Sequence, residues 1–129
     1  MKRLFVTTAV LEVGAGLALA AFPSLAAMLL IGAPLTTPAA LILARVGGTG
    51  LLSLGVACWL ARNDAYSGAA RALVAAILLY NVGVGVVVAN AAIGMQPVRV
   101  VLWMVVVVHA AMAGWCVRQL VRKPGGGRV

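Results

Sequence analysis

The stretch VVLWMVVVVHAAMAGW, residues 100–115, is apolar almost throughout and decides the fold class. Transmembrane β-strands alternate apolar and polar residues at every second position, and this stretch shows no such alternation. Valine runs such as residues 105–108 are compatible with a helix in lipid, because unpaired backbone groups are too costly there. The stretch therefore predicts a membrane-spanning α-helix.

The composition of the whole chain extends this prediction. Of the 129 residues, 64% are hydrophobic and 9% are charged, whereas a soluble domain is about half apolar and a quarter charged. Stretches of the length that crosses a bilayer, about 20 helical residues, occupy residues 4–22, 39–61, 72–93 and 100–120. We therefore expect an all-α polytopic membrane protein whose four spans form one transmembrane domain over residues 1–121.

Proline and glycine predict the connections between these spans. Pro23 should end or kink the first span, and residues 24–31 then predict a short interfacial helix. Residues 94–99 predict a tight turn between antiparallel neighbours. The tail, residues 122–129, is basic and rich in glycine, so we expect it to be flexible.

The basic residues predict the orientation in the membrane. Ten Lys and Arg residues against two acidic ones give a net charge of +8. Most of them lie at the ends of the spans that would share one side: Lys2, Arg3, Arg62, Arg71, Arg118, Arg122, Lys123 and Arg128. Because cytoplasmic loops are enriched in such residues, we expect both termini to be cytoplasmic in a cell (inner) membrane. The charge indicates attraction to anionic lipid headgroups rather than nucleic acid binding.

Polar residues inside the spans fall into two layers when depth is counted at about 1.5 Å per residue. The layer about 12 to 16 Å from the cytoplasmic side contains Glu12, Tyr80, Asn81 and His109. A second layer near the outer face contains Arg45 and Asn90. Charged groups at the centre of a bilayer are costly and normally face the interior of the bundle. We therefore expect Glu12 to point toward His109 and Asn81.

These residues leave several roles open. Glu12 is compatible with half of a buried pair with His109 or Arg45, with a proton or ligand site, or with an exposed position near the inner surface. His109 is compatible with a proton relay, a metal ligand or a haem ligand, and a metal site would need further ligands such as Cys116. Arg45 either anchors outer carbonyl groups and Asn90 or extends to the headgroups. We expect no catalytic residue, metal or cofactor.

Small residues recur at spacings that bring them onto one helix face. The first span has Gly16 and Ala20 in line with Glu12, and the second has Gly48 and Gly55. The last span repeats the pattern with Ala110 and Gly114. Because lipid provides no hydrophobic drive between helices, such small-residue faces are how membrane helices approach one another, and we expect them to pack.

The segments LEVGAGLALAAFPSLAAMLLIGAPL, ARVGGTGLLSLGVACWLAR, LLYNVG and VVHAAMAGWC carry a resemblance over most of the chain. Together they resemble small uncharacterised four-span bacterial membrane proteins near the DoxX-like families, which implies the four-span fold. Locally, LEVGAG resembles the first helix of the small multidrug resistance transporters. In those proteins a membrane-embedded glutamate binds protons and cationic substrates in turn, and the resemblance implies that role for Glu12.

Three classes of function follow from these observations. The first is a non-enzymatic membrane protein, a homo-oligomer or an accessory subunit of a partner membrane protein, whose polar residues specify packing. The second is a proton-coupled small-cation transporter using Glu12. The third is a haem or redox membrane subunit using His109.

Overall fold

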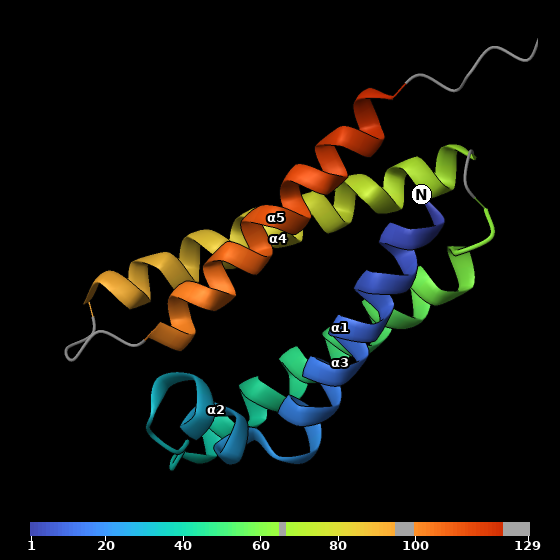
Figure 1. The fold of residues 1–129 in the computed structure, drawn as a ribbon. Coiled ribbons are helices and arrows are strands. Elements are labelled where there is room, and N and C mark those ends of the chain that lie inside the picture. The colour runs from blue at the N-terminus through green and yellow to red at the C-terminus, as the bar shows by residue number, and fades with distance from the viewer. Residues whose placement is uncertain (65–66, 95–99, 123–129) are drawn as a thin grey trace, which may run out of the picture. The chain divides into compact units, whose positions relative to one another are not determined.

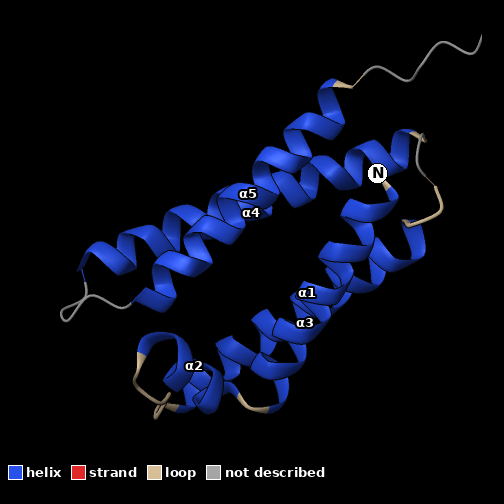
Figure 2. Cartoon of the chain, viewed as in Figure 1, coloured by secondary structure: helices blue, strands red, loops and turns tan. Residues whose placement is uncertain are grey.

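A computed structural model of the chain describes residues 1–64, 67–94 and 100–122, and these residues form five α-helices and no strand (Figures 1 and 2). The helices are α1 (Lys2–Ala21), α2 (Pro23–Ile31), α3 (Pro38–Ala61), α4 (Gly68–Gly94) and α5 (Val100–Val121). All but α2 are long and apolar enough to cross a membrane. The all-α prediction is confirmed, and the chain is a multi-pass membrane protein with four candidate spans.

The start of α4 differs most from the predicted boundaries. This helix begins at Gly68, four residues before the predicted start at residue 72. The reason is a cap: the Ser67 hydroxyl oxygen accepts a hydrogen bond from the Ala70 N–H at 3.0 Å, and the Ser67 hydroxyl donates to the Asp64 carboxylate at 2.6 Å. The predicted turn over residues 95–99 and the tail from residue 123 lie outside the described residues.

The short helix predicted over residues 24–31 is present as α2, which begins at Pro23. Proline suits a first helical position because its missing N–H would have no partner there. The helix ends at Gly32, whose left-handed backbone (φ 72°) lets its N–H donate to the Met28 carbonyl. Thr37 then caps α3, since its hydroxyl oxygen accepts from the Ala40 N–H at 3.3 Å. The interfacial position of α2 stays a prediction.

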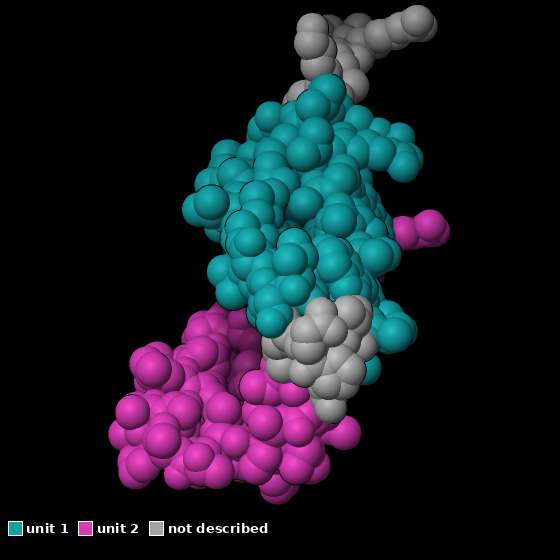
Figure 3. All heavy atoms as spheres, turned by 90° about the vertical axis from the view of Figure 1, so that its left-hand side faces the viewer, with its two compact units in different colours: residues 1, 64–129 teal, residues 2–63 magenta. Residues whose placement is uncertain are grey.

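The chain divides into two compact units, which Figure 3 colours separately. Residues 2–63 contain α1, α2 and α3, whereas Met1 and residues 64–129 contain α4 and α5. The prediction of one domain over residues 1–121 therefore stays a prediction.

Glycines bring the backbones of α1 and α3 into direct contact. A Cβ atom at Gly16 would lie 2.7 Å from the Gly48 carbonyl oxygen, and one at Gly48 would lie 2.6 Å from the Ala20 nitrogen. Nearer the other end, a Cβ atom at Gly55 would lie 2.8 Å from the Val13 side chain. These contacts make α1 and α3 an antiparallel pair (Figure 1) and confirm the predicted packing faces of these two spans.

Helices α4 and α5 form the other pair. A side chain joins their ends, because the Arg71 Nη2 group donates to the Leu120 carbonyl oxygen at 3.0 Å. This bond satisfies a carbonyl in the last turn of α5, where the helix itself offers no donor. The small-residue face predicted on α5 is not used in this pair. Ala110 and Gly114 are both exposed, and a Cβ atom at Gly114 would meet nothing within 4 Å.

Replacing Gly48 with alanine should destabilise the α1–α3 pair, because the new methyl group must displace backbone atoms of α1. Gly50→Ala is the matched control: it adds the same group to the same helix, and nothing lies within 4 Å of that position. We expect Gly48→Ala to be less stable than Gly50→Ala by about 1–3 kcal/mol, measured as the free energy of unfolding in detergent titrated with dodecyl sulfate. Equal stability of the two variants would contradict the contact.

Candidate functional site

Glu12 is buried within its span, with 7% of its surface exposed. It lies one helical turn before Gly16, which contacts α3, and one turn after Thr8. Thr8 is fully buried, and its hydroxyl oxygen has no hydrogen-bond partner among the described residues. Helix α1 therefore carries a buried carboxyl group and a buried hydroxyl group one turn apart on one helix face, and their role as an intramembrane polar site stays a prediction.

Tyr80 and His109 lie together between α4 and α5. Their ring centroids are 5.9 Å apart and their planes are tilted by 55°. Gly85, one turn further along α4 than Asn81, gives the histidine room, since a Cβ atom there would lie 3.7 Å from the Cβ atom of His109. The structure thus brings together two of the four residues of the predicted inner layer.

Asn81 is also buried, with 4% of its surface exposed, and its side chain turns back to its own helix. The Nδ2 group donates to the Ile77 carbonyl oxygen at 2.8 Å. An amide has two N–H donors and an acceptor oxygen, so this bond leaves the amide with further hydrogen-bonding capacity. Asn90 makes the same kind of bond, to the Val86 carbonyl oxygen at 3.0 Å, but is exposed.

Bonding to the carbonyl four residues earlier is shared by the polar side chains of three spans. In addition to Asn81 and Asn90, it is made by Thr49 to Arg45 at 2.9 Å, by Ser53 to Thr49 at 3.0 Å and by His109 to Val105 at 2.8 Å. Each of these side chains thus finds a partner within its own helix, which lowers its cost in lipid without a partner helix. The polar residues need not form one cluster to be satisfied.

The predicted layers cross the boundary between the two units. Glu12 and Arg45 belong to residues 2–63, whereas Tyr80, Asn81, Asn90 and His109 belong to the other unit. The predicted pairing of Glu12 with His109, and that of Arg45 with Asn90, therefore stay predictions.

A line of polar residues on α3 was not identified as a site from the sequence. Arg45, Thr49 and Ser53 follow one another at four-residue spacing and are all exposed. Arg45 was predicted as a polar residue of the outer layer because of its charge, whereas the two hydroxyl residues were not predicted, although their four-residue spacing places them in line with it.

The possible ligands of a metal or haem are spread along the chain. Within residues 1–64, 67–94 and 100–122, no three His, Cys, Asp or Glu side chains come together. Cys58 and Cys116 are buried and not bonded to each other. His109 lines a groove of about 280 Å³ with Met104 and Val108 of the same helix. The predicted role of His109 as a haem ligand stays a prediction.

No family model, no curated protein and no solved structure matches this chain. The two resemblances drawn from sequence motifs therefore stay expectations, and the function is argued from the residues themselves.

The hydrogen bond of His109 predicts which ring nitrogen carries the proton. A carbonyl oxygen can only accept, so the bond to Val105 requires a proton on Nδ1 and leaves Nε2 as the acceptor of the neutral ring. Because the chain has one histidine, ¹⁵N spectra of protein labelled at histidine and held in bilayers should give one set of ring signals. We expect the Nδ1–H tautomer, and a neutral ring protonated on Nε2 would contradict this geometry.

Proposed function

We propose that this chain is a non-enzymatic integral membrane protein that self-associates through one face of α3. The observation that carries the proposal is the line of Arg45, Thr49 and Ser53, exposed on a helix that is long enough to span a membrane. Polar residues in spans normally face protein rather than lipid. A second copy of the chain is the partner that this face fits best, because the face is self-complementary and Arg45 lies near one end of the span.

The first reason is self-complementarity. The hydroxyl groups of Thr49 and Ser53 already donate to their own helix, but each oxygen can still accept a hydrogen bond. Both side chains are small, so two such faces approach closely, and a dimer with a two-fold axis brings identical faces together. The same positions then face their counterparts in the other copy.

The second reason is the position of Arg45. It lies seven residues after Pro38, which is about 10 Å along the helix from that end. The long arginine side chain extends from such a depth to the headgroups. In a dimer, the two guanidinium groups therefore lie among the headgroups, apart from each other. A close contact at Thr49 and Ser53 then places no like charges together in the lipid interior.

The basic residues at the span ends support the orientation of this assembly. They favour a bacterial inner membrane with both termini in the cytoplasm, because loops rich in Lys and Arg stay on that side.

Replacing Ser53 with leucine should weaken self-association, since the larger side chain holds the two α3 faces apart. Gly47→Leu is the control, because Gly47 is exposed elsewhere on α3 and a Cβ atom there meets nothing within 4 Å. Counting single-molecule photobleaching steps in dilute bilayers should give dimers for the wild type and for Gly47→Leu. Ser53→Leu should dissociate roughly tenfold more readily, or about 1.4 kcal/mol. A monomeric wild type would overturn the proposal.

A second candidate function, proton-coupled transport of small cations, is favoured by α1. A buried carboxyl group, Glu12, and a buried hydroxyl group, Thr8, lie one turn apart on the same helix. Carboxylates and hydroxyl oxygens are suitable ligands for cations, and an intramembrane acid is a candidate site for proton exchange. A site of this kind would bind either a proton or a cation, so the two would compete.

Glu12→Gln should abolish proton release on addition of tetramethylammonium, a small cation, to the detergent-solubilised protein, if Glu12 exchanges a proton for a cation. Asp64→Asn is the matched control, because Asp64 is the other acidic residue of the chain and lies in an exposed loop beyond α3. Release that is kept in the control and lost in Glu12→Gln supports transport. No release from the wild type would leave Glu12 as a structural residue.

A further inference from the structure

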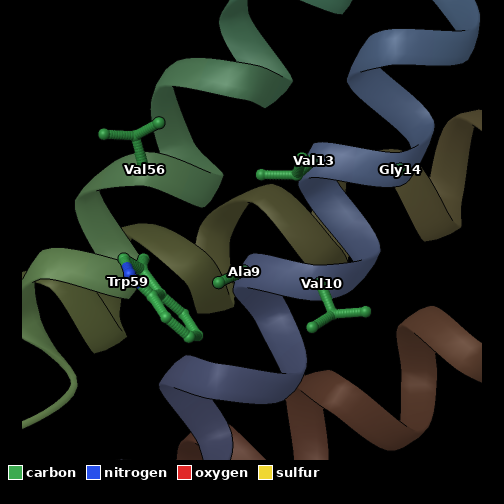
Figure 4. A pocket seen from close by; sticks show the side chains of 6 residues that line it. All are labelled: Ala9, Val10, Val13, Gly14, Val56 and Trp59. Atoms are coloured by element: carbon green, nitrogen blue, oxygen red, sulfur yellow. The ribbon is translucent and has the colours of Figure 1, made fainter.

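One side of the α1–α3 pair is hollowed into an apolar groove of about 500 Å³. Figure 4 shows the residues that line it: Ala9, Val10, Val13 and Gly14 from α1, and Val56 and Trp59 from α3. The walls are open to the surroundings, since 64% of Val10 and 47% of Trp59 are exposed. Helices α1 and α3 therefore leave the groove open on one side.

Gly14 creates part of this space. A Cβ atom at Gly14 would meet nothing within 4 Å, although Gly16, two residues later, is in tight contact with α3. The glycine at position 14 is therefore not needed for the packing of α1 on α3 but leaves room beside Val10 and Val13. A side chain at this position would occupy the groove.

The groove has a basic group at one end. The guanidinium group of Arg62 lies 4.2 Å from the centroid of the Trp59 ring, and its Nη1 donates to the Trp59 carbonyl oxygen at 2.6 Å. A guanidinium has five N–H donors, and this bond uses one of them. The arginine that ends α3 is thus fixed directly beside a wall of the groove.

A second basic residue belongs to the same end of the α1–α3 pair. Arg3 is exposed on α1 and lies seven residues, or about two turns, before Val10, so the two share a helix face. Because α1 and α3 are antiparallel, the start of α1 and the end of α3 lie at one end of the pair. Arg62 and Arg3 therefore both belong to the end of the α1–α3 pair at which Trp59 lines the groove.

From this arrangement we propose that the groove is a binding site for an anionic phospholipid of the surrounding membrane. One acyl chain lies along Val10, Val13 and Gly14, and the phosphate lies between Arg62 and Arg3. Guanidinium groups bind phosphate with paired N–H donors, and tryptophan prefers the headgroup level of a bilayer. Along the site, the apolar wall is followed by the indole ring of Trp59 and then by guanidinium groups. This order suits a phospholipid, whose apolar acyl chain is followed by the headgroup level and then by the phosphate. Charge complementarity selects a net anionic lipid over a zwitterionic one.

The proposal predicts a preference that quenching of tryptophan fluorescence can measure. In a variant that keeps Trp59 as its sole tryptophan (Trp103→Phe, Trp115→Phe), phosphatidylglycerol with brominated acyl chains should quench at least about fivefold more effectively, per mole of lipid, than phosphatidylcholine with the same chains. Arg62→Gln should reduce this ratio toward one while quenching by both lipids persists. Equal quenching by the two lipids before any arginine is changed would overturn the proposal.

Gly14→Leu tests the groove itself. The leucine side chain should fill the space and reduce the bound phosphatidylglycerol seen by native mass spectrometry of the full chain. Gly50→Leu is the matched control, because it adds the same side chain at an open glycine of α3 that does not line the groove. Both variants should keep the wild-type circular dichroism, since a Cβ atom at either position would meet nothing within 4 Å. Unchanged lipid binding in Gly14→Leu, or an equal loss in Gly50→Leu, would overturn the site.

Discussion

The contact between the backbones of α1 and α3 is the constraint on which the rest of the first unit depends. At Gly16, Gly48 and Gly55 the two helices are so close that a single methyl group would overlap with main-chain or side-chain atoms. In lipid, where no hydrophobic effect drives helices together, this close approach supplies the van der Waals contact that holds a pair. The same contact sets the positions of three features of this unit. They are the face of α1 with Glu12 and Thr8, the polar line on α3, and the apolar groove beside Gly14.

The polar residues of the spans follow a second rule, which is local. Thr49, Ser53, Asn81, Asn90 and His109 each bond to the carbonyl four residues earlier in their own helix. A donor satisfied in this way costs less in lipid, but the hydroxyl oxygens of Thr49 and Ser53 keep the capacity to accept a further hydrogen bond from a neighbouring helix. The charged groups differ, because neither Glu12 nor Arg45 can be neutralised by a backbone carbonyl in this manner. The functional proposals therefore concern the buried acid on α1 and the α3 face headed by Arg45.

Much of the fold could be predicted from the sequence, because apolar stretches of this length have few alternatives in a membrane. The four spans, the short helix after Pro23 and the glycine contacts of α1 and α3 all followed from composition and spacing. The early start of α4 did not, because the cap at Ser67 is formed by polar residues outside the apolar stretch. Ala110 and Gly114 were predicted to form a packing face, but the α4–α5 pair does not use it. A small-residue pattern indicates where helices can approach one another but not which helix packs there.

The candidate site was harder to predict, for a physical reason. Depth along a span follows from counting residues, and on this basis Tyr80 and His109 were placed at one level, where the structure brings their rings to 5.9 Å. The direction in which a side chain points depends on helix rotation, which depth does not specify. The groove was missed because it results from the absence of a side chain at Gly14, and an open glycine looks the same in sequence as a packed one.

Helix α3 packs on α1 through its glycine face, and we propose that it packs on a second copy through Thr49 and Ser53. Spin labels placed singly along α3, with Cys58 and Cys116 replaced by alanine, would test it through their accessibility to oxygen dissolved in the bilayer. We expect low accessibility at positions 49 and 53 and high accessibility at positions 43 and 47, which are exposed elsewhere on the helix. Equal, high accessibility at all four positions would mean that α3 faces lipid everywhere except at α1, and would contradict the assembly.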